Sequence, residues 1–333
     1  MKAFIKAISY YLPETVLTNE DISNQFPEWS AEKVASKVGI KYRHISGEKE
    51  TASDMAFKAA LKLFEEHKVD KSDIDFILLC TQSPDYYLPS SSCILQDRLG
   101  LSKHCGAFDF NLGCSGFIYG LAVAKGLLSA GIATNILLLT SETYTKHIHP
   151  QDKGNKTIFG DAAAAILISN EGIGEINEFV LRTDGSGFEH LIVKNGALRN
   201  HRITNECNLD EEGNIIAPDY LYMNGSEVFA FTIKEVPLLI DEILNSNGLI
   251  KEDINQFVFH QANKFMLTHL RKRLNIDEEK FFIYMEEVGN TVSSSIPIAL
   301  YEANKQNKIK KREKVLLAGF GVGLSWGGVV ITY

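Results

Sequence analysis

One pattern of short apolar runs and longer helical segments occurs twice along the chain, and this repetition limits the folds that the sequence can adopt. In the first half, "DFILLCTQS" and "FDFNLGC" are each followed by a helix-like segment, and "NILLLTSE" comes next. In the second half, "INQFVFHQAN" precedes the helix-like "KFMLTHLRKRLNI", and "KVLLAGFG" follows later. Apolar strands that alternate with helices are typical of α/β proteins with buried strands.

The two halves superpose strand by strand. "DFILLCTQS" matches "NQFVFHQAN", "NILLLTSE" matches "KVLLAGFG", and "FGDAAAAILIS" matches "GLSWGGVVITY". In this register, Cys114 and Asn290 stand at the starts of equivalent helices. We therefore predict an N-terminal half over residues 1–170, an inserted connection rich in turns over 171–220, and a C-terminal half over 221–333.

Composition and charge argue against several classes of protein. The apolar runs are far shorter than the roughly 18 residues of a membrane span, and the N-terminal segment lacks a signal-type core, so we expect a cytoplasmic protein without a membrane span. The five cysteines form no CxxC pair, which argues against a metal site or a disulfide framework. A formal net charge of −8 argues against a nucleic-acid binder.

Cys114 is a candidate nucleophile. It precedes the apolar helix-like "SGFIYGLAVAKGLLSAG", and the start of a helix favours a thiolate through unpaired N–H groups and the helix dipole. Gly113 and Gly116 leave room for a substrate beside it. A cysteine at such a position also packs well as a small buried side chain, so Cys114 alone does not define a site.

His260 and Asn290 complete a possible catalytic set. His260 ends the strand-like "INQFVF", and Asn290 stands in "GNT" before a helical stretch. Each has a structural alternative, as a hydrogen-bonded histidine or as a helix cap. All three residues, however, fall at the carboxyl ends of strands, the edge at which open α/β sheets bind ligands. Sulfur can accept an acyl group, and histidine and asparagine can donate hydrogen bonds to an oxyanion.

Four motifs in this order resemble the β-ketoacyl-acyl-carrier-protein synthase III family of the thiolase superfamily. They are "CSGFIYGL", "FGDAAAA", "HQAN", and "GNT" with "SIPIAL", and "GFGVGLSWG" follows them; the similarity extends from "ISYYLPETVLTNEDI" to the last strand. The resemblance implies a thiolase-like five-layered αβαβα fold of two similar halves and a homodimer. It also implies an acyltransferase that needs no metal and no tightly bound cofactor.

The reaction that the resemblance implies has two stages. Cys114 takes an acyl group from a thioester of coenzyme A or of acyl carrier protein. Malonyl-acyl carrier protein then loses carbon dioxide while His260 and Asn290 hydrogen-bond its thioester carbonyl, and the enolate attacks the acyl-cysteine. The backbone N–H groups of Cys114 and Val322 would form the oxyanion hole, with Val322 at a position where the family usually has glycine.

Further residues are assigned by the resemblance alone. Lys33 and Lys153 stand where members that use coenzyme A carry a tryptophan and an arginine against the adenine, and an ammonium group does not reproduce the stacking of a guanidinium. Leu88 aligns with a residue that reaches across the dimer to the partner's acyl pocket. The remaining assignments are Phe159 and Asn263 for substrate binding, and Lys264, Arg271, Lys272 and Arg273 for docking the acidic carrier protein.

Other functions stay open at this point. One alternative is a related acyltransferase that passes the acyl group of Cys114 to another acceptor in a specialised pathway. Papain-like proteases use the same residue types in the same order, but an aromatic residue follows their cysteine, whereas Ser115 and Gly116 follow here. A non-catalytic subunit of a carrier-protein assembly is a third alternative, although all three candidate residues are intact. Gly321 and Gly323 do not start a βαβ unit, which argues against a dinucleotide site.

Overall fold

The strands of the two predicted halves meet in one mixed sheet. This arrangement is seen in a computed structural model that describes residues 2–210 and 213–333; residue 1 of the predicted N-terminal half and residues 211–212 of the predicted connection lie outside the described residues. The nine strands of the sheet lie in the order β13-β14-β15-β8-β1-β7-β6-β4-β5. Their bounds are β1 (Phe4–Tyr11), β4 (Phe76–Cys80), β5 (Gly106–Phe110), β6 (Asn135–Glu142), β7 (Ala162–Ser169), β8 (Gly174–Thr183), β13 (Gln256–Phe259), β14 (Lys314–Gly321) and β15 (Ser325–Thr332).

The strand order mirrors the sequence duplication. Starting from the middle of the sheet, β1, β7, β6 and β4 follow one another toward one edge, and β8, β15, β14 and β13 follow one another toward the other edge. The pairs β4 and β13, β6 and β14, and β7 and β15 are therefore equivalent, which confirms the register predicted from the sequence. Only two residue pairs join β1 to β8, Phe4 with Glu175 and Ile5 with Gly174. The two sides of the sheet can therefore separate and enclose helices between them.

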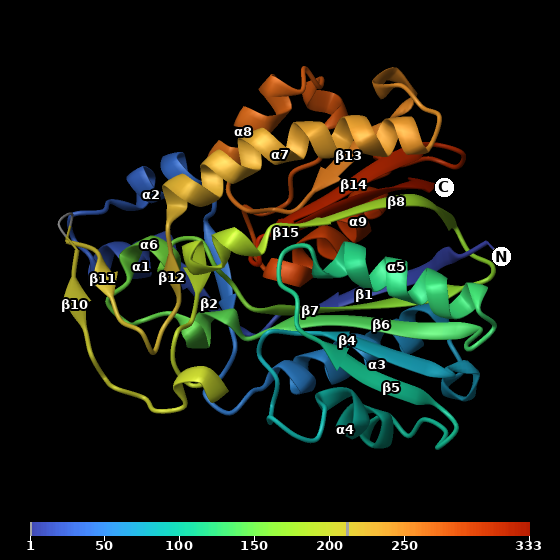
Figure 1. Ribbon diagram of the computed structural model, residues 1–333, viewed down its shortest axis with the longest axis horizontal. Helices are drawn as coiled ribbons and strands as arrows, with labels where there is room; N and C mark the ends of the chain where they lie inside the picture. The colour runs from blue at the N-terminus through green and yellow to red at the C-terminus, as the bar shows by residue number, and fades with distance from the viewer. Residues whose placement is uncertain (1, 211–212) are drawn as a thin grey trace.

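Helices cover both sides of the sheet and fill the space between its two parts. In Figure 1 the layers follow one another as α7 and α8, then β13 to β8, then α9 and α5, then β1 to β5, then α3 and α4. This is the five-layered αβαβα arrangement predicted from the sequence. The helices are α1 (Asn19–Gln25), α2 (Ala31–Val38), α3 (Ala52–His67), α4 (Ser91–Arg98), α5 (Gly116–Ser129), α6 (Lys153–Lys156), α7 (Gly225–Ser246), α8 (Lys264–Arg273) and α9 (Ser295–Lys305).

Three buried clusters form the core. One packs α3 against β1, β6 and β7, one fills the space around α5 and α9, and one lies under α7 and α8 and reaches α1 and α2. The central layer is tight because α5 carries glycine where it meets the sheet. A Cβ at Gly120 would lie 2.7 Å from Cδ1 of Leu138 on β6. The glycines of α5 thus serve the close approach of helix and sheet as well as the start of the helix.

Part of the predicted connection over 171–220 is a strand of the sheet. β8 lies within this range and pairs with β15 along most of its length. The sequence pattern does not predict this strand, because one of its faces is partly exposed and carries polar residues. The rest of the range forms short strands and 3₁₀ turns, including β9 (Leu191–Ile192), β10 (Asn208–Leu209), β11 (Ile215–Ile216) and β12 (Tyr222–Met223). The boundaries of the three predicted segments stay a prediction.

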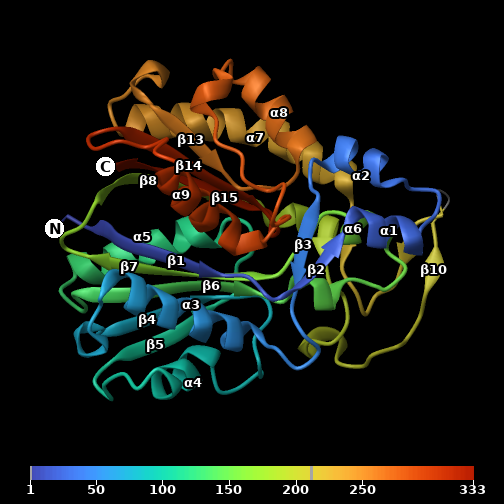
Figure 2. The ribbon, with the colours of Figure 1, turned by 180° about the vertical axis from the view of Figure 1, so that it is seen from behind.

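Small elements gather at one end of the sheet. Figure 2 shows α1, α2 and α6 there, together with the two-stranded ribbon of β2 (Thr15–Thr18) and β3 (Tyr42–Ile45). The parallel strands β4, β5 and β6, and β13 with β14, direct their carboxyl ends toward this end of the molecule. Any site at the strand ends is therefore covered by these elements. No helix within the described ranges has the length and hydropathy needed to cross a bilayer.

Candidate active site

Cys114 lies between β5 and α5, buried at the carboxyl end of the sheet. Its side chain is 6% exposed, and Ser115 is the N-cap of α5, so the cysteine precedes the helix by two residues. The end of β14 passes directly over it. A Cβ at Gly321 would lie 2.8 Å from both Cβ and Sγ of Cys114, so only glycine at this position leaves the sulfur accessible to a substrate.

Backbone hydrogen bonds reach the sulfur of Cys114. Burial raises the pKa of the Cys114 thiol to about 12, the backbone of Val322 acts in the opposite direction, the carboxyl of Glu142 raises the pKa further, and the backbone of Cys114 itself lowers it. The thiol is therefore protonated at neutral pH when the site is closed. The same two backbone groups are positioned to bind the oxygen of an acyl group attached to this sulfur. The resemblance assigns the same two groups to the oxyanion hole, and this role stays a prediction.

His260 follows β13 directly and is 2% exposed. Its Nδ1 lies 2.7 Å from Oγ of Ser295 at the start of α9, and this hydroxyl oxygen accepts a hydrogen bond from the N–H of Gln261 at 3.3 Å. The arrangement lets Ser295 donate to Nδ1, which keeps the ring proton on Nε2. Burial lowers the pKa of His260 to about 3, against a hydrogen bond to the Val292 backbone that favours the charged form. His260 is therefore a neutral hydrogen-bond donor.

Asn290 is held by the chain on both sides. Its N–H donates to the carbonyl of Ile158 at 2.9 Å, and its carbonyl accepts from the N–H of Gly160 at 3.0 Å. Its side-chain Oδ1 accepts a hydrogen bond from the N–H of Val292 at 2.9 Å. The amide oxygen is thereby occupied, and the amide nitrogen is left to donate to a ligand.

The loop that carries Asn290 is strained at one residue. Val292 is fully buried and has a φ of 52°, in the left-handed region that β-branched residues rarely adopt. This conformation directs its N–H onto Asn290 and ends regular structure there. The prediction that Asn290 starts a helix is therefore wrong by a few residues, since a 3₁₀ turn (Val292–Ser294) separates it from α9. Strain of this kind is often found at functional sites.

The three candidate residues are linked through shared neighbours. The ring of Phe320 lies edge-on to the ring of His260, with centroids 5.8 Å apart, and Gly321 beside it covers Cys114. Val292 contacts both His260 and Asn290. Two superposable halves thus contribute to one site, the nucleophile from the first and both side-chain donors from the second. The described residues contain no group of three His, Cys, Asp or Glu side chains that could hold a metal ion.

The chain is similar to proteins of one enzyme family over nearly its whole length. A β-ketoacyl-[acyl-carrier-protein] synthase III of Clostridium perfringens is 36% identical over 322 residues, which cover 96% of each chain. The chain belongs to the β-ketoacyl-[acyl-carrier-protein] synthase III family. Residues 108–185 match the family description 3-oxoacyl-[acyl-carrier-protein (ACP)] synthase III, and residues 244–333 match the description of its C-terminal part.

Solved structures of this synthase III family share the same fold. A crystal structure of a 3-oxoacyl-(acyl-carrier-protein) synthase III is 46% identical and superposes with a TM-score of 0.98 over 100% of both chains. A synthase III structure from Thermus thermophilus is 34% identical, with a TM-score of 0.87 over 99% of each chain. The thiolase-like fold predicted from the sequence is thereby confirmed.

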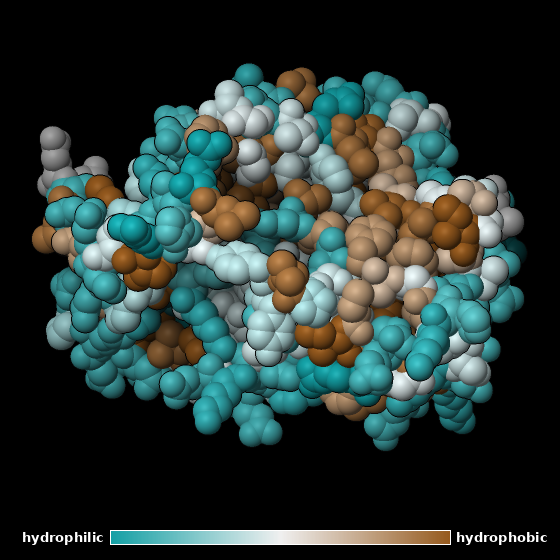
Figure 3. Space-filling view, turned by 60° about the horizontal axis from the view of Figure 1, so that its bottom comes forward, coloured by the Kyte–Doolittle hydropathy of each residue, from teal (hydrophilic) through white to brown (hydrophobic). Residues whose placement is uncertain are grey.

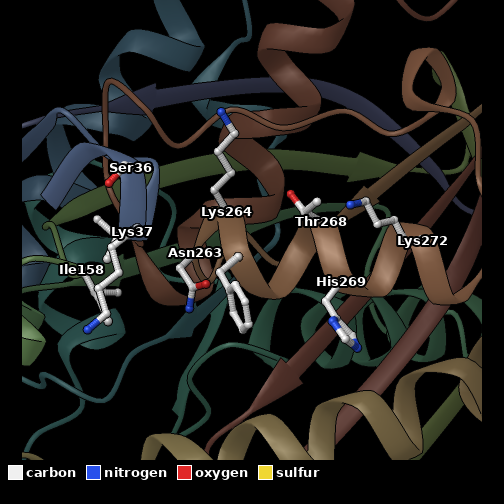
Figure 4. A pocket seen from close by; sticks show the side chains of 10 residues that line it. Ser36, Lys37, Ile158, Asn263, Lys264, Thr268, His269 and Lys272 are labelled. Carbon is white, nitrogen blue, oxygen red and sulfur yellow. The ribbon is translucent and has the colours of Figure 1, made fainter. Parts of the chain in front are cut away.

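A hollow of about 680 Å³ lies between α2, α8 and the segment around Ile158. Figure 4 shows Lys37 on one side of it and Asn263, Lys264, Thr268, His269 and Lys272 along the other. Asn263 caps α8 by accepting the N–H of Met266 at 2.9 Å, which leaves its amide nitrogen to donate to a ligand. Ile158 is hydrogen-bonded to Asn290, so this hollow lies next to the loop that carries Asn290. The predicted role of Asn263 in substrate binding stays a prediction.

Lys33 and Lys153 lie outside the residues that line this hollow. The ammonium of Lys33 is 5.7 Å from the ring centre of Trp29, and that of Lys37 is 5.0 Å from it. Lys153 forms an ion pair with Glu28 at 3.0 Å. Two ammonium groups thus lie near the ring of Trp29, and the charge of Lys153 is paired with Glu28. Their predicted role in substrate binding stays a prediction.

The predicted docking residues lie on α8 but differ in their surroundings. Lys264 and Lys272 line the hollow, and Lys272 and Arg273 are exposed. Arg271 instead donates to the carbonyl of Ile276 at 3.1 Å and pairs with Glu278 at 3.4 Å. Arg271 thus supports the end of its own helix, whereas the two lysines and Arg273 remain available to a partner.

Leu88 and Phe159 occupy opposite environments. Leu88 is 82% exposed, whereas Phe159 is 3% exposed. Phe159 forms a strand-like bridge with Asn290, and its ring lies 5.0 Å from that of Tyr144. Phe159 therefore packs beside the loop that carries Asn290. The predicted reach of Leu88 into a partner subunit stays a prediction.

Sequence reasoning missed two buried residues near Cys114. Glu142 ends β6 with no exposed surface and accepts hydrogen bonds from the N–H of Gln82 and, at 3.1 Å, from the hydroxyl of Ser83. Tyr144 follows two residues later and is 4% exposed. The available signal was "SETY", which places a carboxylate and a phenol shortly after the apolar run "NILLL", in a position equivalent to the end of β14.

Proposed function

We propose that this chain catalyses a decarboxylative condensation that joins an acyl group to malonyl-acyl carrier protein. The proposal is carried by one observation: a buried cysteine, contacted by two backbone N–H groups, shares a closed site with a neutral histidine and an oriented asparagine amide. The names of the relatives support this assignment, since those proteins are β-ketoacyl-acyl carrier protein synthases. The hollow beside α8 supplies an approach for a thioester on a long arm.

In the first stage, the sulfur of Cys114 attacks the thioester carbonyl of the acyl donor. The C–S bond of the donor breaks, and the proton of Cys114 leaves with the released thiol. The oxyanion of the tetrahedral intermediate accepts hydrogen bonds from the N–H groups of Cys114 and Val322. A thiol with a pKa of about 12 is a poor nucleophile, so proton loss has to accompany the attack, and the oxyanion donors lower the barrier for it.

In the second stage, the malonyl thioester loses carbon dioxide, and the electron pair of the broken C–C bond moves onto the thioester oxygen. His260 and Asn290 donate hydrogen bonds to this enolate oxygen, which stabilise the charge as it develops. The enolate carbon then attacks the acyl carbonyl, the bond to Cys114 breaks, and its thiolate regains a proton from solvent. Because the pKa of His260 lies at about 3, this residue acts as a neutral donor throughout.

Acyl carrier protein would dock on α8. This partner is acidic, and Lys264, Lys272 and Arg273 provide local positive charge on a chain whose net charge is −8. Phe265, 62% exposed on the same helix, adds an apolar contact. Electrostatic attraction of this kind chiefly raises the rate of association and fixes orientation.

We also propose that the chain forms a homodimer through the edge of the sheet at β5. This strand pairs only with β4, and Phe108 on it is 38% exposed. The nearby segment carries Tyr86, Tyr87 and Leu88, which are at least 62% exposed. The face that carries β5 at the bottom of Figure 1 comes forward in Figure 3, where apolar groups gather among polar ones. An unpaired edge with apolar neighbours is commonly covered by a partner.

The cytoplasmic location stays a prediction.

The test measures acylation and condensation separately by intact-protein mass. Incubation with acyl-coenzyme A and acyl-carrier protein donors should add one acyl mass to the wild type and none to Cys114→Ala. Malonyl-acyl carrier protein should then remove that mass and yield a β-ketoacyl product. His260→Ala should still accept the acyl group but discharge it at least about 100-fold more slowly.

Each alternative outcome is informative. Acylation that malonyl-acyl carrier protein never discharges would favour the acyltransferase that uses another acceptor. Failure of every donor to label Cys114 would contradict the assignment of the nucleophile. A preference for the carrier-protein donor over coenzyme A would agree with a Trp29 surface that is already occupied by lysines.

A further inference from the structure

A second cavity adjoins the site and shares no lining residue with the α8 hollow. It has a volume of about 810 Å³ and lies between the 82–87 segment and the connection around 191–221. Val322 lines it, and a Cβ on Gly113, the neighbour of Cys114, would meet Cγ1 of Val322 and Oε1 of Gln82 at 2.6 Å each. The cavity therefore begins beside the nucleophile, where an acyl chain bound to sulfur would extend.

The lining of this cavity is mixed in chemistry. Leu191, Val193 and Leu221 are aliphatic, whereas Gln82, Tyr144 and His147 are polar. Tyr144 belongs to the same buried cluster as Cys114, and its pKa is raised by burial first and then by the nearby thiol of Cys114 and carboxyl of Glu142. The phenol is thus close to the sulfur rather than at the far end of the cavity.

The hydroxyl of Tyr144 has no hydrogen-bond partner among residues 2–210 and 213–333. The residue is only 4% exposed. Its hydroxyl oxygen, however, is not one of the described buried polar atoms that lack both solvent contact and a hydrogen bond. It therefore opens into the cavity that its ring lines. Buried tyrosine hydroxyls are normally hydrogen-bonded, so a buried phenol that faces a substrate cavity indicates a partner on the substrate.

The position of Tyr144 is fixed by its surroundings. Its ring lies between Phe159, at 5.0 Å, and His147, at 5.8 Å between centroids. The next residue, Thr145, is bound to the buried carboxylate of Asp161 through its N–H at 2.9 Å and its hydroxyl at 2.6 Å. A phenol that is held by two rings and a doubly anchored neighbour is preorganised, so little entropy is lost when it donates a hydrogen bond.

We propose that Tyr144 selects acyl groups that carry a neutral oxygen, a hydroxyl or a ketone, close to the thioester. This inference rests on the proposed function, because it names the acyl group that Cys114 accepts. An alkyl chain would displace the water that satisfies the phenol in solution and would supply no acceptor in its place, whereas an oxygen substituent restores the hydrogen bond.

The oxygen is expected to be neutral because of the charges that face the cavity. Asp85 and Asp219 line it, and no lysine or arginine is among the described residues that do so. His147 provides no positive charge either, since burial lowers its pKa, although Asp161 and the Gln82 backbone act in the opposite direction. A carboxylate on the acyl chain would therefore meet acidic groups without a cation to pair with it.

The experiment compares acyl groups of one chain length. Butanoyl, 3-oxobutanoyl and both enantiomers of 3-hydroxybutanoyl thioesters are offered to the wild type, to Tyr144→Phe, and to Tyr119→Phe, which removes a phenol hydroxyl from α5 outside the cavity. For the wild type, kcat/KM should be about 10-fold or more higher for at least one oxygenated acyl group than for butanoyl. Tyr144→Phe should abolish this preference without lowering the value for butanoyl, and Tyr119→Phe should retain it.

Two results would overturn the inference in distinguishable ways. Equal efficiency of all four thioesters with the wild type, or a loss in Tyr144→Phe that affects butanoyl as strongly, would refute selection by Tyr144 and leave the condensing function intact. Failure of all four to acylate Cys114 would refute the proposed function, and the inference with it. A fold defect cannot imitate the expected result, because the measured quantity is a ratio between substrates for one variant.

Discussion

Replacing Glu142 with glutamine should stabilise the protein relative to the wild type, and this gain should grow as the pH rises. The carboxyl of Glu142 is fully buried at the end of β6, and burial raises its pKa from 4.5 to about 8, against hydrogen bonds from Gln82, Ser83 and Ser293 that favour the charged form. Between these two values the folded state binds the proton more tightly than the unfolded state does. Stability therefore falls as the pH rises through this window.

The size of the effect follows from the two pKa values. Each unit of difference corresponds to about 1.4 kcal/mol, so the carboxyl costs the folded state ~2 kcal/mol at pH 6 and ~4 kcal/mol at pH 8. Glutamine does not titrate and keeps an oxygen that accepts the N–H of Gln82. The free energy of unfolding of Glu142→Gln, relative to the wild type, should thus rise by about 2 kcal/mol between pH 6 and pH 8.

Thermal unfolding at pH 6, 7 and 8 measures this change. At about 2 cal/mol/K of unfolding entropy per residue, a chain of 333 residues would show a relative shift in Tm of about 3 °C. Glu65→Gln, on the exposed part of α3, is the matched control, and its difference from the wild type should stay constant over the same range. Parallel curves for Glu142→Gln and the wild type would mean that Glu142 is already ionised at pH 6, and would refute the reasoning.

Two further predictions concern the backbone donor and the docking helix. Val322→Pro removes an N–H that reaches the sulfur of Cys114, so the acylation rate measured by intact mass should fall about 100-fold or more. Val322→Ala keeps this N–H, and its rate should stay within a few-fold of the wild type. Equal rates for both variants would exclude a role for this N–H. Lys272→Glu should raise KM for malonyl-acyl carrier protein about 5-fold or more and leave KM for malonyl-coenzyme A nearly unchanged, and equal effects on both substrates would place Lys272 in the path of the arm rather than on the docking surface.

Much of the fold could be predicted from the sequence because the duplication restricts it. The strand-like runs have the length and apolar content of buried strands, and the register between the halves matches the order seen in the sheet. The prediction failed at β8 because a strand with one partly exposed face carries too many polar residues to resemble a buried one. Short-range pattern cannot show that β15 lies beside it.

The reacting groups could be predicted more readily than their surroundings. Cys114 and His260 stand directly at strand or helix ends, where position alone indicates a site. The start of the helix after Asn290 was placed too early because nothing in "GNTVSSS" shows that Val292 adopts a positive φ. The proposed role of Tyr144 could not be predicted, because the sequence does not show how close the end of β6 lies to Cys114.

The division of the site between the two halves makes the acyl-cysteine a sign of completed assembly. Cys114 enters from the half that contains β5, and the groups that complete its environment enter from the loops after β13 and β14. A chain that has folded only its first half while it leaves the ribosome would have the thiol but would lack the covering Gly321, the N–H of Val322, and the side chains of His260 and Asn290. Such an intermediate should neither capture acyl groups from the cell's thioester pool nor waste malonyl units, so we expect the chemistry to begin only after the second half has folded.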